Sequence, residues 1–169
     1  MNTQGQLRRD AITRAWFFLK QARGYPYRTD ISAHEPFEAY LEASIIFSRV
    51  AIHRLRREAL RRAKADPRLK TEVDAWWDAL LKNPAITFFR IEPDFIAKVG
   101  PPKVGQIVRL GGPVPEKMEE LYYYENPDIP ATETVERHLR SVERIVKEAE
   151  ERFGTETSFG HWKNSSPPS

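Results

Sequence analysis

Hydrophobic residues recur along most of this chain at three- and four-residue spacing, the repeat of an amphipathic helix. The longest such stretch runs from Phe37 to Ala63, and nothing inside it breaks a helix. Its first half is apolar on more than one face, as expected of a central helix that neighbours cover. Its second half carries five arginines against the single acid Glu58. The pattern predicts a helix that begins inside a bundle and ends as a basic, solvated rod.

Two cap-and-proline pairs divide the middle of the chain. These pairs are Asp66-Pro67 and Asn83-Pro84. In each pair the first side chain can accept hydrogen bonds from the free amides at a helix N-terminus, and the proline suits the first helical position. The helix after Asp66 has a predicted buried stripe of Leu69, Val73, Trp76 and Leu80. Pro93 lacks an amide donor, so we expect a kink or a break there, with a short helix at about residues 94–99.

The first and last helices are predicted from the same periodicity. Leu7 to Ala22 is amphipathic, and Gly24 and Pro26 end it. Ala131 to Phe153 keeps an apolar stripe over its whole length. It also places acid before base at four-residue spacing on its outer face, an arrangement that stabilises a helix. These pairs are Glu133–Arg137, Glu136–Arg140 and Glu143–Lys147.

Between about residues 100 and 130 the helical pattern stops. This segment is rich in glycine and proline, and Val104–Leu110 and Leu121–Tyr124 favour strands. We expect a loop or a small hairpin packed beside the helices. The three tyrosines of Tyr122–Tyr124 either form a surface for a protein partner or for stacked bases, or they cover the bundle.

Together, these patterns predict an all-α protein, an antiparallel bundle of four or five helices with a small loop or β-hairpin insertion before the last helix. The chain of 169 residues suits one domain that buries a real core. We place the bundle domain at residues 1–154, with the insertion at about 100–130. Residues 155–169 are polar and are expected to form a flexible tail.

Composition excludes several kinds of chemistry. The chain has no cysteine, so it has no disulfide, no thiol nucleophile and no cysteine-ligated zinc. None of its four histidines follows an acidic residue at three-residue spacing, so no carboxylate-bridged metal centre is expected, nor any cofactor. The N-terminus lacks an apolar run and no stretch is long enough to span a membrane, so we expect a cytoplasmic protein without membrane contact.

Two groups of basic residues carry candidate chemistry. Arg54, Arg57, Arg61, Arg62 and Lys64 either contact nucleic-acid phosphates or form a solvated helix end. Arg49 and His53 share one helix face, where they could hold a phosphate and move a proton. An ion pair of Arg49 with Glu38, Glu42 or Asp10 is the favoured alternative.

The order of these features resembles the HEPN superfamily. The resemblance lies in AWFFLKQA, FEAYLEASIIFSRVAIHRL, VDAWWDALLKNPAITFFR and ETVERHLRSVERIVKEAE, which together span most of the chain. It implies a helical bundle that often dimerises, and either a metal-independent ribonuclease or an inactive module that binds RNA or a partner. Active members carry an arginine followed a few residues later by a histidine. The matching region, Arg90 to Lys98, keeps the arginine and has no histidine.

Two functions follow from this resemblance. The first is a non-catalytic HEPN-like module, expected to form a homodimer, that binds RNA, a nucleotide or a protein partner. The alternative is a divergent ribonuclease or a phosphate-handling hydrolase. Such an enzyme would use Arg90, Lys98 and His138, and it requires the last helix to pass beside the segment that contains Pro93.

Overall fold

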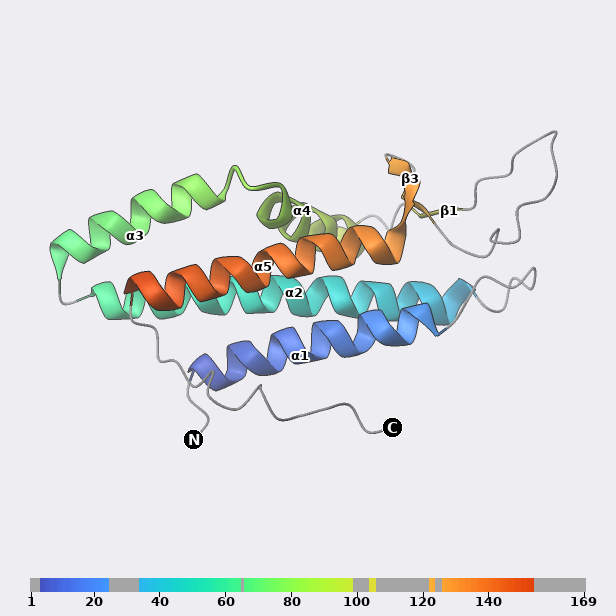
Figure 1. Cartoon of the computed structure of the whole chain (residues 1–169), viewed down its shortest axis with the longest axis horizontal. Helices are drawn as coiled ribbons and strands as arrows, with labels where there is room; N and C mark the ends of the chain where they lie inside the picture. The colour runs from blue at the N-terminus through green and yellow to red at the C-terminus, as the bar shows by residue number, and fades with distance from the viewer. Residues whose placement is uncertain are drawn as a thin grey trace.

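The structure, a computed structural model, describes residues 4–24, 34–64, 66–98, 104–105, 122–123 and 126–153. This part of the chain forms five helices, α1 (Gln4–Arg23), α2 (His34–Ala63), α3 (Pro67–Leu80), α4 (Pro84–Lys98) and α5 (Ala131–Phe153). Three short strands, β1 (Val104–Gly105), β2 (Tyr122–Tyr123) and β3 (Asn126–Pro130), precede α5. In Figure 1, α1, α2 and α5 run side by side, and α3 and α4 lie on the side of α2 away from α1. The predicted all-α helical bundle is confirmed.

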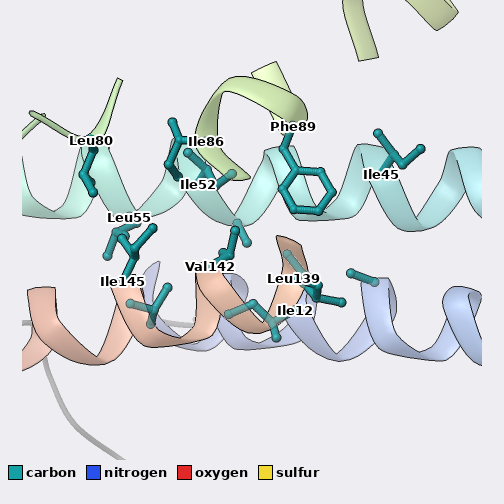
Figure 2. Packing of buried hydrophobic residues seen from close by; sticks show 14 of the residues in the cluster. Ile12, Ile45, Ile52, Leu55, Leu80, Ile86, Phe89, Leu139, Val142 and Ile145 are labelled. Atoms are coloured by element: carbon teal, nitrogen blue, oxygen red, sulfur yellow. The ribbon is translucent and has the colours of Figure 1, made fainter. Parts of the chain in front are cut away.

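The core lies around α2. Leu41, Ile45 and Leu55 of this helix are fully buried. Figure 2 shows Ile45, Ile52 and Leu55 of α2 close to Ile86 and Phe89 of α4 and to Leu139, Val142 and Ile145 of α5. The burial of these large aliphatic and aromatic side chains stabilises the packed helices more than their intrinsic helix propensity does.

The second half of α2 is not the solvated rod that the arginine run suggested. Glu58, Ala59 and Ala63 are buried, so one face of the helix stays inside the bundle up to its last residue. The arginines occupy the remaining faces. The first half differs as well, because Ile46 is 43% exposed. The prediction compared the composition of the two halves of α2. It was wrong because burial of a helical residue depends on the face that it occupies, not on the half of the helix that contains it.

Both predicted helix caps are present. The side chain of Asp66 accepts hydrogen bonds from the amides of Arg68 at 2.9 Å and Leu69 at 3.3 Å. The side chain of Asn83 accepts from the amide of Ala85 at 2.9 Å. The predicted stripe of α3 then packs inward, with Val73, Trp76 and Leu80 buried. Trp76 meets Phe153 edge-on, which fixes α3 against the end of α5.

Pro93 does not break α4. The helix runs from Pro84 to Lys98 with Pro93 inside it, so the expected separate short helix is wrong. Pro93 is buried. Its ring therefore packs into the bundle, and this burial offsets part of the cost of the missing amide donor.

The predicted bounds and buried stripe of α5 are confirmed, from Ala131 to Phe153. Two of its three predicted ion pairs form, Arg137 with Glu133 and Arg140 with Glu136. The third is wrong. Glu143 accepts a hydrogen bond from the indole of Trp16, and Lys147 lies 3.9 Å from Glu151 instead.

The insertion contains a small antiparallel sheet in the order β1-β2-β3. The pairing of β1 with β2, Val104 opposite Tyr123, matches the predicted hairpin. The third strand, Asn126–Pro130, was not expected because it contains two prolines. It lies at the edge of the sheet, where a missing amide donor is tolerated. Tyr124 and the predicted tail at 155–169 lie outside the described residues.

A buried polar cluster ties three helices together. Arg8 of α1 is fully buried and forms ion pairs with Glu58 of α2 and Glu150 of α5. Ser44 of α2 adds a hydrogen bond to the carbonyl of Ala15 in α1 at 2.8 Å.

Within the described part of the chain, no helix combines the length and apolarity needed to cross a membrane.

Candidate functional site

Two of the three proposed catalytic residues, Arg90 and His138, lie on facing helices, α4 and α5. Arg90 is exposed on α4 and lines a small cavity with residues of α2. His138 of α5 does not line this cavity, and its ring stacks on Phe88 with centroids 4.6 Å apart. Among the described residues, no hydrogen bond or ring contact joins Arg90 to His138. Lys98 ends α4, and its side chain lies outside the described part.

His138 is a packed ring. It contacts Phe88 face to face and Phe89 edge-on, so the last helix passes beside α4 as predicted. Burial lowers the pKa of His138, because removal from water disfavours the charged imidazolium. The histidine therefore stays neutral near pH 7 and fills space between α4 and α5.

His53 is the histidine that lines a cavity with Arg90. Arg49, His53 and Arg90 line the same cavity between α2 and α4. The Nε of Arg49 donates to Nε2 of His53 at 3.2 Å. Arg49 forms the expected ion pair, but its partner is Asp94 rather than Glu38, Glu42 or Asp10. The reason is the unbroken α4, which carries Asp94 past Pro93 and along α2.

The basic end of α2 is spread around the helix. Arg57, Arg61 and Lys64 are exposed, whereas Arg54 and Arg62 are partly covered. The one acid of this stretch, Glu58, points inward to Arg8. Arg56 lies over the ring of Trp77 at 4.8 Å. These side chains point in different directions around α2, so they offer scattered phosphate contacts.

A groove between α1 and α5 brings basic residues from two helices around one cavity. Its volume is about 750 Å³. Ile12 of α1 and Val146 of α5 are buried and form its apolar floor. Five cationic side chains line it, against the single carboxyl group of Glu143. The cationic residues are Arg9, Arg137, Arg140, Arg144 and Lys147.

Three of the groove's cations, Arg137, Arg140 and Arg144, are loosely held. Arg137 and Arg140 pair with Glu133 and Glu136 of the preceding turn, and both arginine side chains are more than half exposed. Such exposed pairs contribute at most about 1 kcal/mol, so an incoming anion can replace them. The Nη2 of Arg144 donates to the hydroxyl of Ser141 at 3.1 Å, and Arg144 has no carboxylate partner among the described residues.

Glu143 is the titratable group of the groove. Its Oε1 accepts from the indole Nε1 of Trp16 at 2.7 Å. Burial raises the pKa of this carboxyl, and the Trp16 hydrogen bond and the charge of Arg140 oppose the increase. The carboxyl therefore takes up a proton at higher pH than an exposed glutamate, and the groove then becomes more positive.

A signal for this groove is present in the sequence, although the expected ion pairs concealed it. Arg137, Arg140, Arg144 and Lys147 recur at spacings of three, four and three. Such residues share one helical face. Three of the four were expected only to pair with acids one turn earlier. The α1 wall could not be inferred, because nothing local to Arg9 indicates which face of α5 it meets.

No group of three or more potential metal ligands occurs among the residues that the structure describes.

No family model, no curated protein and no solved structure matches the chain. The resemblance to the HEPN superfamily therefore stays a prediction from sequence pattern.

Proposed function

We propose that this protein is a non-catalytic, HEPN-like helical module that binds RNA in the groove between α1 and α5. The observation that carries the proposal is the convergence of five cationic side chains around an apolar floor. The ligand unit it suits is a nucleotide, a phosphate next to a flat, partly apolar base.

The chemistry of the lining suits both halves of such a unit. Guanidinium groups bind phosphate oxygens through paired N–H donors, and three of the lining residues are arginines from one face of α5. Bases stack on apolar surfaces and on guanidinium planes. The volume of about 750 Å³ lies within the range of sites that hold small ligands, so one or two nucleotides of a strand can enter it.

Binding without cleavage is supported by what the groove contains. Its lining residues include no histidine, which is the best general acid–base group near neutral pH. The alternative enzyme needs Arg90 and His138 to act together, and among the described residues no hydrogen bond or ring contact joins them, although Phe89 contacts His138 and lines a cavity with Arg90. The HEPN resemblance also implies a homodimer, which light scattering of the purified protein would test.

The proposal is tested by fluorescence anisotropy with a labelled single-stranded RNA of about ten nucleotides, the scale of known single-strand sites. We expect saturable binding by the wild-type protein and binding weakened tenfold or more in Arg144→Gln, because each charge-assisted phosphate contact contributes about 1.5–3 kcal/mol. Arg144 is exposed, so its substitution leaves the core intact. The RNA should stay intact on a gel.

Arg61→Gln is the matched control. It removes the same charge from an exposed position at the α2 end, outside the groove, and should bind RNA like the wild type. An equal loss in Arg61→Gln would show that diffuse positive charge, and not the groove, holds the RNA. RNA cleavage would refute the non-catalytic assignment. Binding of an acidic peptide in place of RNA would identify the groove as a protein-docking site.

A further inference from the structure

One face of α2 is left open by the other described helices. α1, α4 and α5 pack along α2, and its core residues face them. The opposite face carries four apolar residues at spacings of four, three and four, namely Ala39, Ala43, Ile46 and Val50. Ala39 and Ile46 are exposed, and the other two are only partly buried. This spacing is that of an apolar seam between two helices, so the first half of α2 carries a seam without a described partner.

Aromatic residues on the α1 side widen this apolar face. Phe17 of α1 is 53% exposed and meets Phe18 edge-on, with ring centroids 5.2 Å apart. Phe18 in turn stacks on Phe47 of α2 at 5.5 Å. Phe17 and Ile46 are two of the three large hydrophobic residues that are exposed in the described chain. Apolar surface gathered in this way marks a site of interaction with another protein.

The charge beside the seam changes sign along α2. Glu38 and Glu42 lie one turn apart near the start of the helix, and Arg57 is exposed further along. Neither Glu42 nor Arg57 makes a hydrogen bond or an ion pair with another described residue. Burial raises the pKa of Glu42, and the negative charge of Glu38 raises it further. A cation supplied from outside the chain would therefore be stabilising at Glu42.

We propose that a second copy of this chain covers this face, with its α2 antiparallel to the first α2 across a two-fold axis. When the axis lies midway between Ile46 and Val50, Ile46 of each copy meets Val50 of the other. Ala39 then lies opposite Arg57 of the second copy, and Arg57 pairs with Glu42, one turn along from Ala39. A parallel arrangement would set Glu42 against Glu42 and Arg57 against Arg57, so the charge pattern favours the antiparallel one.

The seam is tested by sedimentation equilibrium of the purified full chain over a wide concentration range. We expect a monomer–dimer equilibrium for the wild type and association weakened about tenfold or more in Ile46→Ser, because each dimer loses two buried isoleucines. Ile46 is 43% exposed, so this change leaves the core intact, and circular dichroism checks the fold. Ile91→Ser is the matched control, since Ile91 is an isoleucine of α4 that is 55% exposed and lies outside the seam. A monomeric wild type, or equal association of Ile46→Ser and the wild type, overturns the proposal.

Charge exchange tests whether the partner is a second copy. Glu42→Arg and Arg57→Glu should each associate several-fold more weakly than the wild type, because each sets like charges together at both ends of the seam. An equimolar mixture of the two variants should recover the wild-type association, since both contacts then join opposite charges. Failure of the mixture to recover overturns the two-fold arrangement. Arg144→Gln should associate like the wild type, so this result is independent of RNA binding in the groove.

Discussion

Glu143 places a carboxyl group among the cations of the α1–α5 groove, where an RNA phosphate would meet it. The side chain is fixed by the indole of Trp16, which in turn lies under the guanidinium of Arg140 at 6.0 Å. Its ionised form repels a phosphate, and its protonated form can donate to one. Because burial already raises its pKa, the carboxyl is poised to take up a proton when an anion arrives.

RNA binding is therefore expected to strengthen as pH falls from 7.5 toward the raised pKa of Glu143. Glu143→Gln should mimic the protonated carboxyl, since glutamine can still accept from Trp16. We expect this variant to bind several-fold more tightly than the wild type at pH 7.5, for a relieved repulsion of about 1 kcal/mol, and to lose most of the pH dependence. Anisotropy titrations at pH 7.5 and at a series of lower pH values measure this. An unchanged pH profile in Glu143→Gln would show that another group controls it.

The Arg8 cluster joins α1, α2 and α5 at one buried point. One guanidinium faces the carboxylates of Glu58 and Glu150, so full ionisation would leave a net negative charge inside the bundle. Burial is the main cause that raises the pKa of Glu150, Glu58 adds to it, and the charge of Arg8 opposes it. A proton on Glu150 balances the cluster, whereas loss of Arg8 would leave two unpaired acids between the helices.

Arg8→Met should lower the free energy of unfolding by about 3–5 kcal/mol, the usual cost of removing one partner from a buried ion pair. Glu150→Gln should cost far less, because glutamine still accepts from Arg8 without adding charge. Urea denaturation of both variants measures this difference. Equal stabilities of Arg8→Met and the wild type would show that the cluster does not hold the helices together.

Comparing the wild type with Glu150→Gln also tests the proton on Glu150. A raised folded-state pKa contributes stability that is complete below the ordinary value of about 4.5 and is lost as pH rises through the folded-state pKa. The stability of the wild type relative to Glu150→Gln should therefore decline over that interval. A difference that stays constant with pH would mean that Glu150 is already ionised in the fold.

Helices and caps were predictable because their signals are local. The periodicity of α5 and the Asp66 and Asn83 caps need only a few neighbouring residues, and the structure confirms them. Contacts between distant helices gave no such signal. Arg8 lies 142 residues from Glu150, and its local pattern only marks it as a charged residue in an amphipathic helix. The groove was missed for the same reason, since one wall comes from each end of the chain.

The whole molecule carries a net charge of only +3, yet its described surface has two separate basic regions. One is the α1–α5 groove, and the other is the end of α2 with Arg57 and Arg61. Net charge cannot distinguish them as RNA sites. Salt dependence can, because each phosphate contact on a single strand adds about −0.7 to the slope of log K against log salt concentration.

We expect a slope of about −2 for the wild type, as for three phosphates held by the cations of the groove. Arg144→Gln should reduce its magnitude by about 0.7, because that variant loses one phosphate contact. Arg61→Gln should leave the slope unchanged, since its charge lies outside the groove. Anisotropy titrations at several salt concentrations give all three slopes from one series. If Arg61→Gln flattened the slope as much as Arg144→Gln did, RNA would be held by diffuse positive charge over the surface, and the groove would not be its binding site.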